Sequence, residues 1–419
     1  MTVPIVTIPT YWTRKGGVKK LTDSYFDHPT ALDGEQTLTR TLDSFKSVEG
    51  DFKVVVISTV VDYKDAKLIR SVTKRVNSLV KKYAKYYPIM HFSKEDVSFL
   101  RKRMSKYSHS NGLASQINLT CYPAIRNFQL IIANALGSDS MIGIDDDELV
   151  MPEHIKKATE FIGKKYGGER IYGIGGFYRN KEGTYFMKDM PKPKQNNVFV
   201  RKNYVKNKGF IEIDKLKGRL HKSNFVFGGN MVIHRNMFMN VAYDLAISRG
   251  ENMDYLINAR MNGFDFYFDK EQYIIHMPPE DNSKKKEKWA KTGAFSAENF
   301  YKLQQDIMRF VYENQKIIEC NEHHAELKKI DTKKLMPYPG SFFVKNLLED
   351  AVEVLNTMFH KEIQKKEIMP KSFVRSTLER SRKLAPQYFI FNKQWKKLMK
   401  EISKDKTFSN YLNKKWVKN

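Results

Sequence analysis

Three consecutive carboxylates, Asp145, Asp146 and Asp147, follow the apolar residues 141–144. An apolar run that stops on acidic residues is typical of a buried strand, and open α/β sheets bind ligands at the carboxyl ends of their strands. Adjacent carboxylates repel one another, so the cluster is costly unless a cation neutralises it. Oxygen ligands of this kind suit Mg²⁺ or Mn²⁺, which are commonly shared with substrate phosphates. The alternative interpretation is a solvated acidic loop or a helix N-terminus without a metal.

The elements that must position these carboxylates alternate between strand and helix. Residues 4–11 form a β-branched run that predicts a first strand, and residues 52–61 predict a second, fully buried strand. Apolar residues at helical spacing follow each strand, at 37–48 and at 65–83. This alternation predicts an α/β fold with a Rossmann-like, mostly parallel sheet and flanking helices.

The remaining pattern predicts further strands and helices of the same fold, followed by a basic, mainly helical segment. Around the acidic cluster we expect helices at 123–136, 153–166, 235–248 and 253–261, strands at 170–178, 231–233 and 264–268, and a polar, basic, hairpin-like stretch at 181–220. Beyond a boundary at 282–291, a basic and mainly helical extension is expected, with helices at 296–318, at 342–359 and from 370 onward. We therefore predict two domains, residues 1–280 and 281–419.

The composition indicates a globular protein. The 419 residues are 41% hydrophobic and 13% aromatic, which is enough to form a large core. There are two cysteines, Cys121 and Cys320, which exclude a disulfide framework and indicate a reducing compartment. No apolar run is long enough for a membrane-spanning helix, and the first residues lack a signal-peptide pattern. We therefore expect a cytoplasmic protein.

The net charge of +26 predicts an anionic partner. The candidates are nucleotide phosphates, a phosphorylated or carboxylated acceptor, an anionic membrane surface and a nucleic acid. Positive charge is especially abundant after residue 280. The lysines there are spread rather than gathered into one block, so the alternative is that they simply solvate the outer faces of helices.

Other residues that could do chemistry occur in a fixed order along the chain. They are Pro9, Thr10 and Tyr11 at the end of the first strand, Arg126 and Asn127 on the helix before the acidic strand, Gly229 and Asn230 in a glycine-rich strand turn, Gly250, Glu251, Asn252 and Asp254 at a helix start, and His276 after a late strand. This order, over residues 4–279, resembles the GT-A glycosyltransferases, especially their family-2-like group. The resemblance implies a metal-dependent hexosyltransferase that moves a sugar from a nucleotide-diphosphate donor to an acceptor hydroxyl.

The resemblance also implies a role for each motif. Asp145, Asp147 and His276 would hold Mn²⁺ or Mg²⁺, with Asp145 also contacting the donor's ribose or sugar and Asp146 lying between them. Donor binding would further involve Arg126 and Asn127 near the nucleotide or its phosphates, and Pro9, Thr10 and Tyr11 around the base. Sugar or acceptor binding would involve Gly229 and Asn230. The structural alternatives are an ordinary strand-end histidine, a surface arginine and a plain strand-to-loop turn.

Asn252 departs from the inverting members of this group. They commonly have a Gly-Glu-Asp segment whose last carboxylate takes the acceptor proton, whereas an amide cannot act as a base. The segment Gly250-Glu251-Asn252 is more similar to that of the retaining polypeptide N-acetylgalactosaminyltransferases, so we expect retention of anomeric configuration. Glu251 and Asp254 could still bind the acceptor or act as base. Their structural alternative is a pair of acids favoured by the helix dipole.

Two other function classes remain open at this stage. A nucleotidyltransferase acting on sugar phosphates would use a basic glycine-rich loop after the first strand, as in Arg14-Lys15-Gly16-Gly17. A basic nucleic-acid-binding protein would explain the charge but not the ordered motifs, so no nucleic acid partner is expected. The extension could complete the acceptor site, form a homo-oligomer, or dock peripherally at the inner membrane surface through its lysines and Trp289, Trp395 and Trp416.

Overall fold

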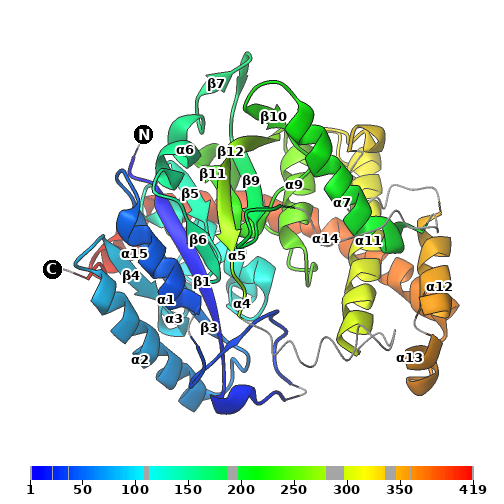
Figure 1. Ribbon diagram of the computed structural model, residues 1–419, viewed down its shortest axis with the longest axis horizontal. Coiled ribbons are helices and arrows are strands. Elements are labelled where there is room, and N and C mark those ends of the chain that lie inside the picture. The colour runs from blue at the N-terminus through cyan, green and yellow to red at the C-terminus, as the bar shows by residue number, and fades with distance from the viewer. Residues whose placement is uncertain are drawn as a thin grey trace.

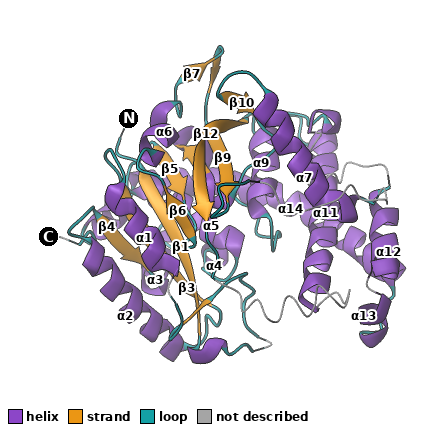
Figure 2. Ribbon diagram, in the orientation of Figure 1, coloured by secondary structure: helices purple, strands orange, loops and turns teal. Residues whose placement is uncertain are grey.

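A ten-stranded sheet lies at the centre of the computed structural model, with helices packed around it (Figure 2). The structure describes residues 2–20, 22–35, 37–107, 113–185, 197–279, 297–335, 346–358 and 360–417. The strands of the sheet are β1 (Ile5–Thr13), β2 (Thr30–Ala31), β3 (Lys53–Val60), β4 (Ile89–Phe92), β5 (Ser140–Gly143), β6 (Glu148–Val150), β9 (Gly173–Arg179), β10 (Leu220–Lys222), β11 (Met231–His234) and β12 (Phe266–His276). Their order is β10-β12-β9-β11-β5-β1-β3-β4, with β2 beside β1 and β6 beside β12.

Most neighbours in this sheet are parallel. The strands β4, β3, β1 and β5 run in one direction, β9 and β12 are also parallel to each other, and β11 is antiparallel between β5 and β9. All nine residues of β1 are buried, as expected for a parallel strand that is covered on both faces. The α/β fold with a mostly parallel central sheet, predicted from the alternation of elements, is confirmed.

The helices fill both the α/β layer and the C-terminal part of the chain. They are α1 (Thr37–Ser44), α2 (Ala66–Tyr83), α3 (Lys94–Met104), α4 (Leu113–Gln116), α5 (Tyr122–Ala135), α6 (His154–Glu160), α7 (Val198–Lys215), α8 (Arg235–Phe238), α9 (Glu251–Met261), α11 (Ala297–His323), α12 (Leu347–Met358), α13 (His360–Lys365), α14 (Pro370–Lys404) and α15 (Lys406–Asn413). A separate two-stranded hairpin pairs β7 (Lys165–Tyr166) with β8 (Glu169–Arg170).

The hairpin-like structure predicted for 181–220 is wrong where the structure describes it. The helix α7 occupies most of this stretch, while residues 186–196 lie outside the described residues. The Asn197 side chain accepts a hydrogen bond from the backbone N–H of Phe199 and so caps the helix. Phe210 and Ile213 on α7 pack into a small aromatic cluster against the sheet. This tertiary burial offsets the weak helical signal of a basic sequence.

Two predicted helices are shorter than expected. The helix predicted at 153–166 ends at Glu160, and the hairpin of β7 and β8 follows it. The helix predicted at 235–248 ends at Phe238. Beyond that point the Asn127 side chain accepts from the Tyr243 backbone N–H at 2.8 Å and donates to its carbonyl at 2.9 Å. These bonds use backbone groups that a continuing helix would need.

The C-terminal helices share the core of the α/β layer. The helix α14 runs behind the sheet in Figure 1 and packs on α5, and Trp395 on α14 is fully buried. The Trp395 indole N–H donates to the carbonyl of Phe238 at 2.9 Å. A helical C-terminal extension is thus confirmed. The boundary between residues 280 and 281 stays a prediction, because residues 280–296, which include Trp289, lie outside the described residues.

No helix in the described ranges is both long enough and apolar enough to cross a membrane.

We expect Trp395→Ala to lower the free energy of unfolding by about 3–5 kcal/mol, because it leaves a cavity at the junction of α14 with the α/β layer. Urea unfolding measures the change. Ile390→Ala on the same helix is the matched control, since Ile390 is 52% exposed and its truncation should cost less than about 0.5 kcal/mol. Equal losses for the two variants would contradict the shared core.

Candidate active site

A cavity of about 480 Å³ opens at the carboxyl edge of the parallel strands. Among the predicted site residues, those that line it are Tyr11, Arg126, Asp145, Asp146, Asp147, Glu251, Asn252 and His276. A larger surface hollow of about 1100 Å³ lies over α1 and α2, and its lining contains none of the predicted site residues. The convergence of these residues from distant parts of the chain makes the smaller cavity the candidate active site.

The acidic cluster forms a turn between two strands of the sheet. The strand β5 ends at Gly143, and the backbone N–H of Asp145 then donates to the Glu148 carboxylate at 2.8 Å. Glu148 begins β6, which pairs with the end of β12. This pairing brings Asp147 to His276, whose Nε2 lies 3.2 Å from Asp147 Oδ2. Two residues that are far apart in sequence therefore meet because their strands are neighbours.

Asp147 and His276 together could hold a divalent metal ion. Burial alone would raise the pKa of Asp147, but the hydrogen bond and charge of His276, with a contribution from His28, outweigh it and lower that pKa. Within the described ranges, no group of three or more His, Cys, Asp or Glu side chains has the geometry to hold a metal. Two protein ligands nevertheless fit Mg²⁺ or Mn²⁺, because these ions usually take their remaining ligands from water and substrate phosphates.

Arg126 joins the acidic turn to the start of α9. Its side chain is 5% exposed, with Nη2 at 2.9 Å from Asp145 and Nε at 3.2 Å from Glu251. A Cβ at Gly228 would lie 2.4 Å from Nη2 of Arg126, so any larger residue there would force the guanidinium to shift. Burial raises the pKa of Asp145, and Arg126 opposes that rise. The predicted metal ligand Asp145 is therefore paired with a cation of the protein itself.

Some predicted donor residues lie outside the cavity lining. Pro9 and Thr10 lie within β1, paired in register with Ile57 and Ser58 of β3, rather than at a strand-to-loop turn. They are therefore part of the sheet beneath the site, whereas Tyr11 reaches the cavity. Asn127 uses its amide on the backbone of Tyr243, so its role is to hold the chain after α8.

The predicted residues Gly229, Asn230 and Asp254 also lie behind the cavity surface. The Gly229 N–H donates to the Tyr178 hydroxyl at 2.6 Å, and the Asn230 amide donates to the carbonyl of Phe177. Asp254 is fully buried on α9 and pairs with Lys316. Of the two acids at this helix start, the structure brings only Glu251 to the cavity.

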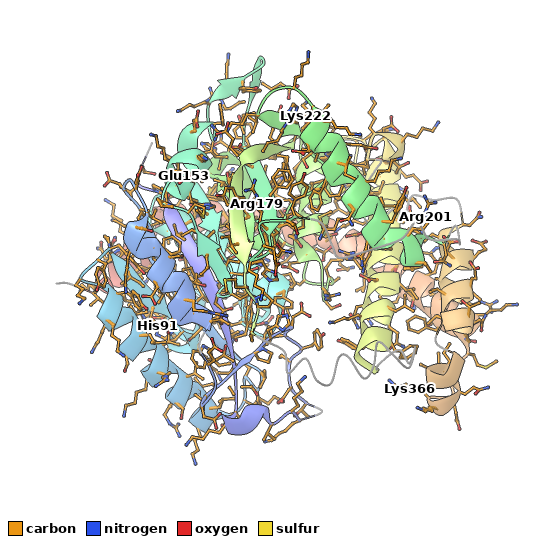
Figure 3. All side chains as sticks on the ribbon, viewed as in Figure 1. His91, Glu153, Arg179, Arg201, Lys222 and Lys366 are labelled. Atoms are coloured by element: carbon orange, nitrogen blue, oxygen red, sulfur yellow. The ribbon has the colours of Figure 1, made fainter. Side chains whose placement is uncertain are left out.

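Several lining residues were missed by the sequence analysis. They are Asp27 and His28 from the loop between β1 and α1, Tyr122, Tyr178, Lys202 and Lys206 from α7, Arg249, and Lys302, Asp306 and Arg309 from α11. Lys202 follows Arg201, which Figure 3 labels on α7. Residues 302, 306 and 309 recur at the spacing of one helix face, a signal that could have predicted a shared surface. The C-terminal helix α11 thus completes the cavity wall.

The residues from α7 and α11 make this wall basic. Lys202 Nζ lies 2.5 Å from the Asp306 carboxylate, which is also 3.5 Å from Arg309. Arg309 donates to the carbonyl of Gly250, the residue before α9. A Cβ at Gly250 would clash with this guanidinium at 1.8 Å, so glycine lets α11 approach the start of α9.

Lys206 occupies a distinctive position in the basic wall. Its ammonium lies 4.6 Å from the centre of the Phe227 ring. Burial, followed by the charges of Lys202 and Arg249, lowers the pKa of Lys206 to about 8. Burial and, to a smaller extent, the charge of Lys206 lower the pKa of His276, but the hydrogen bond and charge of Asp147 outweigh them and raise it. Lys206 and the predicted metal pair therefore line the same cavity.

Behind the cavity, a buried charge network fixes α11 to α9. Lys316 is fully buried and pairs with Asp254 and, at 3.0 Å, with Asp244. The Tyr312 hydroxyl donates to the same Asp244 carboxylate at 2.7 Å. Glu313 is also buried, and burial raises its pKa to about 8 although Arg309 opposes the rise. The network explains the burial of Asp254 without a catalytic role.

No family model and no curated protein matches this sequence. Among solved structures, a mannosyltransferase, PcManGT from Pyrobaculum calidifontis in complex with GDP-Man and Mn²⁺, matches at 8% identity and a TM-score of 0.38, over 96% of this chain and 85% of that one. S. aureus TarS matches at 9% identity and a TM-score of 0.32, over 91% of this chain and 55% of that one. A mycobacterial protein matches at 10% identity and a TM-score of 0.33, over 67% of this chain and 69% of that one. Likeness at this level assigns no donor, acceptor or mechanism to this chain.

We expect Glu313→Gln to stabilise the protein at alkaline pH and to have little effect at acid pH. Burial raises the pKa of Glu313 to about 8 from its ordinary 4.5, so between these values the folded state holds a proton that the unfolded chain has released. Stability therefore falls as the pH rises through this window, and glutamine removes the fall. The gain should be on the order of 5 kcal/mol once the carboxyl would be ionised, because the pKa rises by about 3.5 and each pKa unit corresponds to about 1.4 kcal/mol.

Urea unfolding at about pH 5 and about pH 8.5 measures this difference. Glu322→Gln is the control, because the Glu322 side chain on the same helix is 63% exposed. A gain of equal size at both pH values would contradict the raised pKa of Glu313.

Proposed function

We propose that this protein is a metal-dependent glycosyltransferase that transfers a sugar from a nucleotide-diphosphate donor to an acceptor hydroxyl. The pairing of Asp147 with His276 at the carboxyl edge of the parallel sheet carries the proposal. This edge is where open α/β sheets bind nucleotides. The cavity beside the pair is also lined by Arg126 and Glu251, which supply a cation and a carboxylate close to the reacting groups.

The donor would bind along the acidic turn. The Tyr11 and Tyr122 rings, with centroids 5.3 Å apart, supply aromatic surface at one end of the cavity, which suits a nucleotide base. Asp147 and His276 would hold Mn²⁺ or Mg²⁺ beside the diphosphate. A divalent ion there supplies Lewis-acid stabilisation of the charge that develops on the departing diphosphate. Asp145, held by Arg126, would contact the ribose or the sugar.

The acceptor would bind near the start of α9, with retention of anomeric configuration. Asn252 lines the cavity as an amide that donates to the carbonyl of Val226, and it cannot take a proton. We infer that the departing phosphate takes the acceptor proton, which is compatible with retention. The Glu251 carboxylate, fixed by Arg126, would accept a hydrogen bond from the acceptor hydroxyl and orient it.

The nucleotidyltransferase alternative has less support from the residues that it requires. Arg14, in the basic glycine-containing loop, forms ion pairs with Asp23 at 2.9 Å and with Asp62 at 2.7 Å, and it is absent from the described lining of the cavity. Its charge is therefore used to fasten the loop between β1 and α1.

We expect Asp147→Ala to lower Mn²⁺-dependent turnover of the donor at least about 100-fold, because it removes a ligand of the ion that stabilises the leaving group. Incubation with a panel of nucleotide sugars and Mn²⁺, followed by detection of slow donor hydrolysis, measures the turnover. Asp51→Asn is the control, since Asp51 is exposed and outside the cavity. Circular dichroism should show both variants folded, and full activity of Asp147→Ala would refute the metal assignment.

The stereochemistry has its own test. We expect the anomeric configuration of the transferred sugar to match that of the donor. An NMR spectrum of the product, recorded before any mutarotation, reads the configuration from the anomeric proton. Inversion would overturn the proposal of retention and would make Glu251 the general base.

A further inference from the structure

The two sides of the cavity carry opposite charge. The sheet edge contributes the acidic turn, whereas α7, α11 and the loop before α9 contribute cations. On the basic side, Lys202 and Arg309 share the single carboxylate of Asp306, and Arg249 lies 3.6 Å from Asp27. The cations of this wall therefore outnumber the carboxylates that lie against them.

Lys206 is the centre of this excess. Among the described residues, no carboxylate lies within ion-pair distance of its ammonium, although Lys202 and Arg249 are near enough to lower its pKa. Its contact with the Phe227 ring replaces only a small part of the hydration of the ammonium. Placing two further cations near one half-buried ammonium is unfavourable unless an anion binds between the three.

We propose that the acceptor carries an anionic group, a phosphate or a carboxylate, that binds to Lys206 together with Lys202 and Arg249. This inference rests on the proposed glycosyl transfer. The anionic group would hold the acceptor so that its hydroxyl meets Glu251, two residues beyond Arg249 in the chain. Charge-assisted hydrogen bonds to a phosphate or a carboxylate are stronger than neutral ones, so the same wall would select against neutral sugars.

The position of the wall favours the acceptor over the donor. Asp147 and His276, which would hold the donor diphosphate through the metal, lie on the sheet side of the cavity. The cations come from α7 and α11, and Arg309 donates to the carbonyl of Gly250 directly before Glu251. The basic wall thus adjoins the carboxylate that would orient the acceptor.

Binding of inorganic phosphate tests the proposal without any catalysis. Calorimetric titration should show that Lys206→Met weakens phosphate binding about tenfold or more, because one charge-assisted contact is lost. Lys206→Arg should bind within about threefold of the wild type, since it keeps the charge. The matched control is Lys208→Met on the same helix, where the Lys208 side chain is 59% exposed, and it should bind like the wild type. A parallel titration with acetate distinguishes a carboxylate site from a phosphate site.

The same titration in saturating nucleoside diphosphate and Mn²⁺ shows whether the acceptor or the donor diphosphate uses this site. Phosphate binding that persists supports an acceptor subsite, whereas its loss would assign the wall to the donor diphosphate and overturn the proposal. Equal binding by wild type and Lys206→Met, with both folded by circular dichroism, would also overturn it.

Donor hydrolysis separates this inference from the function on which it rests. The hydrolysis is measured on the wild type, where water replaces the acceptor in the reaction. If the wild type hydrolyses no nucleotide sugar, glycosyl transfer fails and the acceptor assignment fails with it. If hydrolysis occurs but neither phosphate nor acetate binds at Lys206, only the acceptor inference fails.

Discussion

The buried guanidinium of Arg126 is the interaction on which the cavity depends. It reaches Asp145 on the acidic turn and Glu251 at the start of α9, two carboxylates that are far apart in the sequence. Removing one partner of a buried ion pair leaves an uncompensated charge, which is far more costly than the pair itself. Gly228 leaves room for the guanidinium, and Tyr11 of β1 lines the same cavity, so strand, turn and helix meet around one cation.

The second constraint is the fixed position of α11. The Lys316 network fastens this helix to α9, and Gly250 lets Arg309 approach the same helix start. A segment from the C-terminal part of the chain thereby forms one wall of a cavity whose other walls belong to the sheet. Because the wall is basic and the opposite edge acidic, the proposed function would place a metal-bound anion on one side of the cavity and a second anion on the other.

The acidic residues at this site differ in their partners and in their exposure to the cavity, and these differences suit different roles. Asp147 keeps a low pKa beside His276 and faces the cavity, which suits a metal ligand. Asp254 is buried against Lys316 and serves the packing of α11. Glu251 combines exposure to the cavity with a fixed partner, and under the proposed function it is the carboxylate that would meet an acceptor hydroxyl.

The sequence by itself determined the fold class and the edge of the sheet at which the site lies. Parallel strands end at a common edge, so the acidic strand end and the late strand that ends in His276 are expected at the same edge. Only the pairing of β6 with β12 brings Asp147 and His276 together. The tertiary structure decided which residues face the cavity. The helix α9 is buried on nearly all sides, so its sequence has no polar face that could distinguish Glu251 from Asp254. Likewise, the basic wall exists only because α7 and α11 pack beside α9. The spacing of residues 302, 306 and 309 indicates one face of α11, but only the tertiary structure decides what that face lies against.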